Sequence, residues 1–411
     1  METHVGHRVM MLLENNPYPQ DVRVRREAEA LDEAGYRVSV VCPRAPGQRW
    51  RARLNGVRVY RFPPPQKANG LVGYAWEYGY SMAAMFLLTL VVWLREGFDT
   101  IHAHNPPDTL ILVAAPYKLL GRRIVFDHHD LAPELYLARF EGGGNKLVHS
   151  ALILFERLSC RLADHIVCTN ESYKAVEMER GRVPEHRITI VRNGSEPCLS
   201  RRDAPLPNSK TEGRKVVGYA GVIGFQDGVD HLLRALRHLV YDLDRPDVLC
   251  VLVGAGDAMQ ASKSLAVDLG LADHVLFTGW VDHAEVATYL DLADVCVAPE
   301  PSNPYNDRST MIKLMEYMAA GKPIVAFDLP EHRRTASSAA AYTHPNDEFE
   351  FARSLSLLLD DPARREAMGS FGRRRIETEL AWSYSVPHLL AAYRKMGCMP
   401  APEGCLSSEL Q

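Results

Sequence analysis

Short apolar runs alternate with longer stretches of helical period along this chain, and the alternation begins twice. The first half has strand-like runs at residues 7–13, 37–42, 57–62, 100–102, 123–126, 165–168 and 188–191. The second half has them at residues 215–220, 248–253, 275–278, 295–298 and 323–327. Strands joined through crossover helices pair in parallel, so each half predicts a Rossmann-like, doubly wound parallel sheet of the α/β class.

The segment between the halves has the composition of a linker. It reads SRRDAPLPNSKTEGR and is rich in proline, charge and small polar residues. At 411 residues the chain exceeds one ordinary core. We therefore expect one domain at 1–198, a linker at 199–214, a second domain at 215–378, an amphipathic helix at 379–397 and a polar tail at 398–411. Two such domains would face each other across a cleft, where ligands usually bind.

Composition and charge narrow the class of partner. A net charge of −4 argues against binding nucleic acid through a general positive field. The eight cysteines are scattered without CxxC spacing, as is typical of reduced structural thiols. The N-terminus lacks the features of a signal peptide. These observations favour a cytoplasmic protein.

One stretch complicates this interpretation. Residues 78–94, YGYSMAAMFLLTLVVWL, are seventeen residues without a charge, which is the lower limit for spanning a bilayer. We favour a buried or groove-lining helix. The alternative is a surface that touches a membrane or a lipid acceptor.

The most informative segment for function is 307–330, DRSTMIKLMEYMAAGKPIVAFDLP. Asp307, Ser309 and Thr310 are candidate N-caps of an amphipathic helix that a buried strand follows. A helix N-terminus at the carboxyl edge of a sheet attracts phosphate, and Glu316 further along could accept hydrogen bonds from sugar hydroxyls. The segment predicts a ligand that carries phosphate and sugar, although an ordinary capped helix would show the same pattern.

Three loops of small residues follow strands of the second half. They read GVIGFQDG from Gly221, GAGD from Gly254 and FTGWV from residue 277. Glycines such as Gly221, Gly224 and Gly254 let backbone approach phosphate closely. Each loop alone is also compatible with a plain strand-to-helix turn, but together with the helix start near Ser309 they indicate a binding site.

Two histidine-bearing turns follow strands of the first half. IHAHNPPD holds His102 and His104, and FDHHDLAPE holds His128, His129 and Asp130. A metal site is disfavoured because no third acidic or cysteine cluster has convincing spacing. Neutral imidazole both donates and accepts near pH 7, so we expect hydrogen bonding and proton handling around a sugar. Taken singly, His102 and His128 are more often structural.

The loop ENNPYPQD at 14–21 leads into a helix that carries Arg23, Arg25 and Arg26. These arginines could meet a phosphate or an acidic acceptor, and the alternative is a solvated helix face.

Four segments carry a family resemblance: FTGWVDHAEVATYLDLADVCVAPEP, STMIKLMEYMAAGKPIVA, PQDVRVRREAEALDEAGYRV and HDLAPELY. With them the chain resembles glycosyltransferase family 4, which has the two-domain GT-B architecture. The resemblance implies transfer of a sugar, with retention of anomeric configuration, from a nucleotide-diphosphate sugar to a small-molecule or lipid-linked acceptor. A UDP-sugar is expected more than a GDP-sugar. It also implies no metal or other cofactor, a donor on the second domain, an acceptor on the first, and a C-terminal helix that packs back on the first domain.

The resemblance carries roles over to individual positions. Glu316 would bond the nucleotide ribose, and the backbone of Ser309, Thr310 and Met311 would hold the diphosphate beside the glycine loops. Trp280 and Val281 would lie at the base. The catalytic residues would be His129, which would contact the donor sugar, Asp130 and Glu316. The expected acceptor-binding residues are Asn16, Gln20, Asp21, Arg23, His104 and His129.

The sequence departs from the family at the diphosphate. Val222 and Asp227 stand where an arginine and a lysine are usual, and Arg308 replaces the first of two glutamates that are separated by seven residues. We therefore expect Arg308 and Lys313 to meet the diphosphate charge. Two alternatives remain: a non-catalytic subunit that binds nucleotide sugar, and a GT-B sugar-nucleotide epimerase.

Overall fold

The computed structural model describes residues 6–65, 70–140, 143–195 and 213–400. The chain divides into two compact units. Unit 1 comprises Met1–Tyr136, Gly144–Arg192 and Ser385–Gln411, and unit 2 comprises Leu137–Gly143 and Asn193–Tyr384. Most of the expected linker at 199–214 and of the tail at 398–411 lies outside the described residues.

Unit 1 contains an eight-stranded sheet in the order β3-β4-β2-β1-β5-β6-β7-β8. Its strands are β1 (Arg8–Leu12), β2 (Arg37–Pro43), β3 (Arg51–Leu54), β4 (Val57–Phe62), β5 (Thr100–His104), β6 (Arg123–His128), β7 (His165–Cys168) and β8 (Ile188–Ile190). All neighbouring strands pair in parallel except β3 and β4. The antiparallel edge strand β3 was not predicted.

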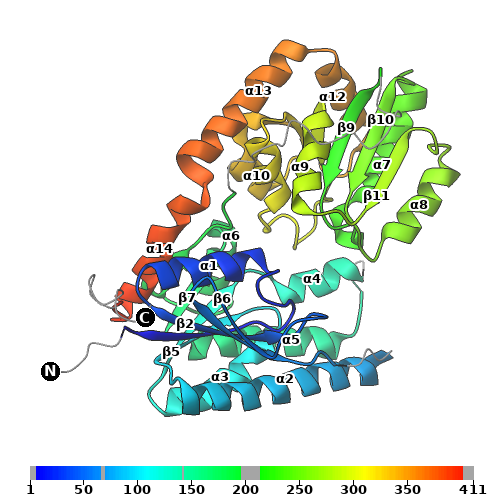
Figure 1. Cartoon of the computed structure of the whole chain (residues 1–411). Helices are drawn as coiled ribbons and strands as arrows, with labels where there is room; N and C mark the ends of the chain where they lie inside the picture. The colour runs from blue at the N-terminus through cyan, green and yellow to red at the C-terminus, as the bar shows by residue number, and fades with distance from the viewer. Residues whose placement is uncertain (1–5, 66–69, 141–142, 196–212, 401–411) are drawn as a thin grey trace. The chain divides into compact units, whose positions relative to one another are not determined.

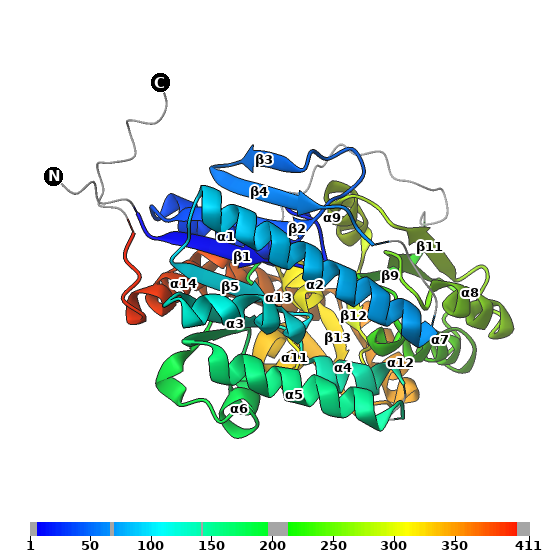
Figure 2. The same ribbon diagram turned by 90° about the horizontal axis from the view of Figure 1, so that it is seen from below.

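Helices cover both faces of this sheet. They are α1 (Val22–Glu33), α2 (Gly70–Arg95), η1 (Asp108–Leu110), α3 (Ile111–Leu119), α4 (Ala132–Arg139), α5 (Lys146–Leu162), α6 (Glu171–Glu179), η2 (Glu185–Arg187) and α14 (Trp382–Lys395). Helices α2, α3 and α5 lie side by side on one face, and α1 lies on the other (Figures 1 and 2).

The C-terminal helix α14 packs on unit 1. Tyr393 is fully buried, with its ring centroid 5.3 Å from that of Tyr36 and its hydroxyl 3.0 Å from His102 Nδ1. The Tyr36 hydroxyl in turn donates to the Cys398 carbonyl at 2.8 Å. The apolar side of the amphipathic helix thus has its partner in the β1–β5 region.

Unit 2 contains a six-stranded parallel sheet in the order β11-β10-β9-β12-β13-β14. Its strands are β9 (Lys215–Ala220), β10 (Val248–Val253), β11 (Val275–Gly279), β12 (Val295–Ala298), β13 (Ile324–Phe327) and β14 (Ala340–Thr343). Its helices are η3 (Phe225–Asp227), α7 (Val229–Arg237), η4 (His238–Asp242), α8 (Met259–Asp268), α9 (His283–Leu292), α10 (Ile312–Ala319), α11 (Pro330–Ala336), η5 (Ser337–Ala339), α12 (Glu348–Leu359), α13 (Pro362–Arg375) and η6 (Ile376–Leu380). The predicted parallel α/β class is confirmed in both units.

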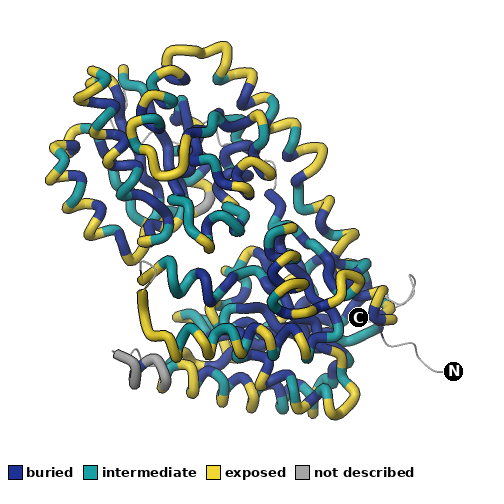
Figure 3. Tube along the Cα trace, turned by 180° about the vertical axis from the view of Figure 1, so that it is seen from behind, coloured by how far each residue is buried: buried dark blue, intermediate teal, exposed yellow. Residues whose placement is uncertain are grey.

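The cores follow from the strand sequences. The run VLCVLV of β10 is buried at every position, as expected for a parallel strand covered on both faces. Buried positions follow the strands, and exposed positions follow the outer sides of the helices (Figure 3). The six described cysteines are free and buried, which fits structural thiols.

Helix α2 is apolar on its outer side. Ser81 and Thr89 are fully buried, whereas Leu87 is 61% exposed and Leu94 is 74% exposed. The segment Trp76–Arg95 is long and apolar enough to cross a membrane, and only 22% of its most apolar 18-residue stretch is buried. The expectation of a buried helix is therefore wrong for the outer face of α2.

Candidate active site

The strand order of unit 2 places its loops where open α/β sheets bind ligands. Strand β9 lies between β10 and β12, so the chain leaves β9 toward one edge of the sheet and later resumes on the other side. Loops after such neighbouring strands diverge, and ligands bind at their carboxyl ends. The two loops in question are residues 221–228 and 299–311.

The glycines of these loops allow close backbone packing. Gly254 has φ +133°, and a Cβ there would lie 1.9 Å from the Gly221 carbonyl oxygen. A Cβ on Gly228, at φ +71°, would lie 2.1 Å from the Pro299 carbonyl oxygen. Gly224 has an ordinary φ of −102°. Contact between the loops thus accounts for part of the glycine pattern that suggested phosphate.

Helix α10 begins without a side-chain cap. Its N-cap is Met311, with φ −76° and ψ 114°, and it makes no side-chain capping bond. In the described part of the chain, six other helices start at Asp or Asn side chains that accept a first-turn N–H, namely Asp21, Asn145, Asn170, Asp282, Asp347 and Asp361. Helices α3, α7, α8 and α11 lack such a cap, as α10 does. The first turn of α10 therefore presents its N–H groups and the positive end of its dipole without an acidic or hydroxyl cap.

The predicted caps serve the preceding loop instead. The Ser309 hydroxyl donates to the Tyr305 carbonyl at 2.8 Å, and Asp307 accepts from the Ser302 hydroxyl at 3.2 Å. The Thr310 hydroxyl lies 3.4 Å from a Glu331 carboxylate oxygen. The capping prediction for Asp307, Ser309 and Thr310 is therefore wrong.

Lys313 lies in a buried ion cluster. Its Nζ is 2.5 Å from Glu300 Oε1, 2.9 Å from the Tyr219 hydroxyl and 3.4 Å from Asp227 Oδ1. Glu300 is fully buried, and its other oxygen lies 3.5 Å from His332 Nε2. Asp227, which stands where the family commonly has a basic residue, thus receives a cation from α10.

The charges in this cluster oppose one another. Burial alone would lower the pKa of Lys313, but Glu300, Tyr219 and Asp227 raise it well above its ordinary value. Burial raises the pKa of Asp227, although Lys313 opposes that shift. One lysine between two carboxylates is not a free cation, so the structure gives Lys313 a role in neutralising buried acids beside the expected diphosphate site.

The other expected donor residues differ in exposure. Trp280 follows β11 and is 79% exposed, and Val281 next to it is half-buried. Arg308 is half-buried and donates from Nη1 to the Pro304 carbonyl at 2.9 Å. Glu316 lies about one turn into α10 and is half-buried. These residues remain within reach of a ligand.

In unit 1, the carboxyl ends of β5 and β6 bring several polar side chains around Asp127. Arg23 Nε and Nη2 donate to the two Asp127 oxygens at 2.7 and 2.8 Å. His104 Nδ1 lies 2.8 Å and His129 Nδ1 3.5 Å from Asp127 Oδ2. Asp127 was not among the predicted site residues, although its position directly before the His-His pair was a usable signal.

This geometry corrects the interpretation of Arg23. Arg23 is only 8% exposed, so it is neither a solvated helix face nor a free surface arginine for an acceptor. Burial raises the pKa of Asp127, but Arg23 and then His129 outweigh burial and hold that pKa well below its ordinary value. Burial lowers the pKa of His129, and Asp127 reverses this to a net increase. Asp127 thus orients His129 and favours its protonated form.

Four buried residues in this region bring potential metal ligands together. One ligand atom each from Glu27, His102, His104 and Asp127 lies within 4.8 Å of the others. Arg23 Nη2 is 3.1 Å from Glu27 Oε1 and also holds Asp127. The guanidinium therefore supplies the positive charge that these carboxylates require.

The remaining predicted residues have local partners. Asp21 accepts from the Val24 N–H at 3.0 Å. The other Asp21 carboxylate oxygen lies 3.4 Å from Asn16 Nδ2. Gln20 is exposed. The backbone of Asp130 is held by Asn105, whose side chain accepts from the Asp130 N–H at 3.1 Å and donates to its carbonyl at 2.6 Å.

His128 points into the core rather than the site. Its Nδ1 lies 3.3 Å from Glu177 Oε1, and its Nε2 lies 3.9 Å from Glu156 Oε2. Burial would lower the pKa of His128, but Glu177 and Glu156 raise it to about 9. His128 is therefore a structural, charged histidine.

Two family profiles match consecutive parts of the chain. Residues 20–194 match "Glycosyl transferase 4-like domain", and residues 201–375 match "Glycosyl transferases group 1". The chain is a GT-B glycosyltransferase of the family 4 type. The two matches follow the two units, one domain of the glycosyltransferase each.

Curated relatives share this organisation over nearly their full length. The glycosyltransferase is 26% identical to a 2-deoxystreptamine glucosyltransferase from Streptomyces kanamyceticus, over 91% of this chain and 98% of the relative. It is 28% identical to a phosphatidyl-myo-inositol mannosyltransferase from Mycolicibacterium smegmatis, over 92% of each chain.

Solved structures share the fold. A sucrose-phosphate synthase from Thermosynechococcus elongatus superposes with a TM-score of 0.77 at 18% identity, over 95% of this glycosyltransferase and 99% of that chain. HepE from Anabaena, in complex with UDP and glucose, has a TM-score of 0.71 at 15% identity, over 94% and 99%.

Proposed function

We propose that this glycosyltransferase moves a sugar from a nucleotide-diphosphate sugar, a UDP-sugar before a GDP-sugar, to a small-molecule or lipid-linked acceptor with retention of configuration. The observation that carries the proposal is the uncapped N-terminus of α10 beside the β9 loop, with Glu316 one turn further along the helix.

This arrangement suits a nucleoside diphosphate. The first-turn N–H groups of α10 and its dipole attract the diphosphate, and Glu316 offers a carboxylate to the ribose hydroxyls. Trp280, 79% exposed at the end of β11, offers an aromatic face to the base. Since Lys313 already balances Glu300 and Asp227, Arg308 becomes the proposed side-chain cation for the leaving diphosphate.

The relatives support a donor and an acceptor of these kinds. Two curated relatives are named as a glucosyltransferase for 2-deoxystreptamine and a mannosyltransferase for phosphatidyl-myo-inositol. HepE, which shares the fold, was solved with UDP and glucose. UDP is therefore the first nucleotide to test.

In the proposed reaction, the bond between the anomeric carbon and the diphosphate oxygen breaks, and the acceptor oxygen bonds to that carbon on the same face. The acceptor proton leaves with the diphosphate. His129, held by Asp127, donates a hydrogen bond to a hydroxyl of the transferring sugar. The helix N-terminus and Arg308 stabilise the charge that develops on the leaving group, so no metal is included.

We also propose a cytoplasmic protein that contacts a lipid surface through the outer face of α2. Leu87 and Leu94 lie seven residues apart on one helix stripe and are 61% and 74% exposed. Sedimentation with phosphatidylcholine vesicles should fall in a Leu87→Ser/Leu94→Ser variant. The matched control replaces the exposed Val267 and Leu357 of unit 2 with serine, and an equal loss there would refute the contact.

Thermal-shift titration with UDP, GDP, ADP, TDP and their sugars tests the proposed donor. A ligand at a hundredfold its dissociation constant adds about 2.7 kcal/mol. The shift should be selective for one nucleotide and weaker in Glu316→Gln than in a control with the exposed Glu366→Gln. Binding without turnover over a broad acceptor panel would favour a non-catalytic subunit, and conversion of the donor without acceptor would favour an epimerase.

A further inference from the structure

A positively charged cavity of about 680 Å³ lies in unit 1, at the end of the sheet opposite His104 and His129. Arg123 opens β6 and His165 opens β7, so the cavity lies at the amino ends of these parallel strands. The residues that line it belong to unit 1 alone. It is therefore separate from both the candidate acceptor residues and the donor residues.

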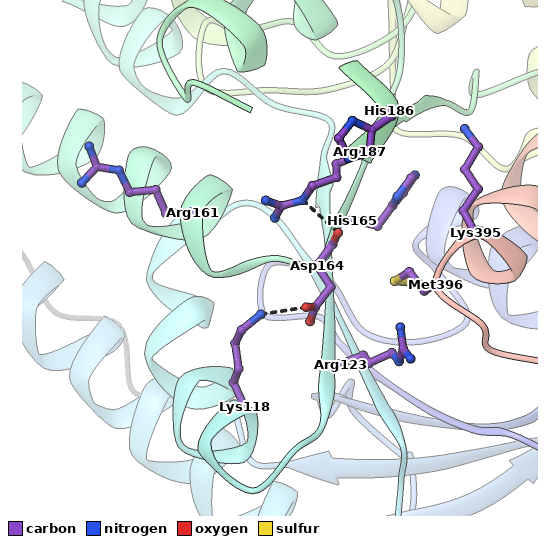
Figure 4. A pocket seen from close by; sticks show the side chains of 9 residues that line it. All are labelled: Lys118, Arg123, Arg161, Asp164, His165, His186, Arg187, Lys395 and Met396. Carbon is purple, nitrogen blue, oxygen red and sulfur yellow. Dashed lines mark hydrogen bonds and ion pairs between the residues drawn. The ribbon is translucent and has the colours of Figure 1, made fainter. Parts of the chain in front are cut away.

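Five cationic side chains from five elements line this cavity, and Figure 4 shows the Arg161 guanidinium pointing away from the other four. They are Lys118 of α3, Arg123 of β6, Arg161 of α5, Arg187 of η2 and Lys395 of α14. Convergence from positions so far apart in the sequence differs from an ordinary solvated helix face, where charges share one element.

Negative charge is scarce at this position. Asp164 is the one carboxylate among the described residues that line the cavity. It lies 2.9 Å from Lys118 Nζ, and its backbone carbonyl accepts from Arg187 Nε at 3.1 Å. Among the described residues, no carboxylate forms an ion pair with Arg123, Arg161 or Lys395. Most of the positive charge is thus uncompensated.

The neighbouring His165 is affected by this excess. It is 2% exposed, and its Nε2 lies 2.8 Å from the Thr189 hydroxyl. Burial lowers the pKa of His165 first, and Lys395, Arg187 and His186 lower it further, to about 4. A further positive charge is disfavoured in this cavity, and an anion is favoured.

We propose that this cavity binds the phosphoryl group of a ligand, either a phosphorylated small molecule or the headgroup of an anionic phospholipid. Arginine forks match phosphate oxygens, and lysine adds charge without fixed geometry. The volume admits a group of sugar-phosphate size. Leu119, adjacent to Lys118, is 90% exposed, which leaves room for the acyl part of a lipid at the rim.

Two binding experiments on the full chain test the proposal at constant ionic strength. Calorimetry measures inorganic phosphate and pyrophosphate, and flotation compares phosphatidylglycerol with phosphatidylcholine vesicles. The test variant is Arg123→Gln/Arg161→Gln, because both side chains are exposed. The control is Arg364→Gln/Arg374→Gln on α13, which makes the same charge change on exposed residues of unit 2.

Binding of the phosphoryl probe should weaken by about tenfold or more in the test variant and stay unchanged in the control. Loss of pyrophosphate binding identifies a soluble ligand. Loss of phosphatidylglycerol binding alone identifies a lipid headgroup. The proposal is wrong if the test and control variants lose binding equally. It is also wrong if the test variant binds both probes as wild type does, which is the result expected when pyrophosphate binds only at the donor site. Arg161→Gln alone serves if the double variant melts early.

Discussion

The buried cluster around Lys313 makes a quantitative prediction. Lys313→Met removes the cation from Glu300, which lies 2.5 Å away and is fully buried, and from Asp227 at 3.4 Å. The methionine fills most of the same volume, so the main loss is electrostatic. Two carboxylates are then left in a dry environment without a partner of opposite charge.

Breaking a buried ion pair from one side costs about 3–5 kcal/mol. For a unit of about 150–250 residues, each kcal/mol lowers the melting temperature by about 2–4 °C, so unit 2 should melt about 6–20 °C earlier. Burial raises the pKa of Asp227, and in the variant Lys313 no longer opposes that shift. Protonation of Asp227 therefore stabilises the fold at low pH, and the deficit should grow as the pH rises from 5 to 8.

Calorimetry of wild type, Lys313→Met, Glu300→Gln and the double variant measures this cycle. The double variant should recover most of the loss, because the buried negative charge of Glu300 leaves with the cation. UDP affinity separates the two roles of the lysine. If the double variant regains UDP affinity together with stability, Lys313 only supports the site. If its UDP affinity stays low although stability returns, Lys313 contacts the diphosphate directly. A Lys313→Met protein that melts with wild type, or a double variant no more stable than the single one, would refute the reasoning.

Three further predictions concern single residues. The pKa of His128, about 9, lies above its unfolded value of about 6.5. Its contribution to the free energy of unfolding, about 3 kcal/mol, is therefore complete below pH 6.5 and is lost as the pH rises through 9. Urea denaturation at pH 6 and pH 9 should show this loss of stability in wild type and much less of it in His128→Asn. Glu316→Gln removes a charged acceptor worth about 1.5–3 kcal/mol, so the donor KM should rise about 10–100-fold. An unchanged KM would contradict the ribose contact. Gly254→Ala should destabilise unit 2 by about 2 kcal/mol or more, because its Cβ would lie 1.9 Å from the Gly221 oxygen, whereas Gly79→Ala, which meets nothing within 4 Å, should not; equal melting of the two variants would refute the packing argument.

The strands could be predicted because buried parallel strands have continuous apolar sequences. The predicted bounds of β4, β7, β9, β10 and β12 agree with the structure. Strands β3 and β14 were not predicted. Strand β3 is RARL, whose charged residues suit an exposed sheet edge and hide its strand character. Its hairpin signal was present, since Asn55 and Gly56 form the two-residue turn with φ +45° and +84°.

The site was harder to predict because buried charges are neutralised by residues far away in the sequence. The sequence indicated His129 and Glu316 but not Asp127, which is paired with Arg23 from 104 positions earlier. The N-cap prediction failed for a related reason. Ser309 and Thr310 are residues of the capping type, but the preceding loop and Glu331 take their hydroxyls, and the helix starts after them.

The two units use the same electrostatic arrangement at the carboxyl edges of their sheets. Arg23 lies between Glu27 and Asp127 in unit 1, and Lys313 lies between Glu300 and Asp227 in unit 2. Each cation faces two buried acids, so each cluster carries one net negative charge unless a carboxyl group or a nearby histidine takes a proton. The sequence predicted that Arg308 and Lys313 together replace the basic pair missing at Val222 and Asp227. In the structure, Lys313 instead forms a buried pair with the acid at 227, so the helix end and Arg308 are the groups that we propose for an incoming phosphate.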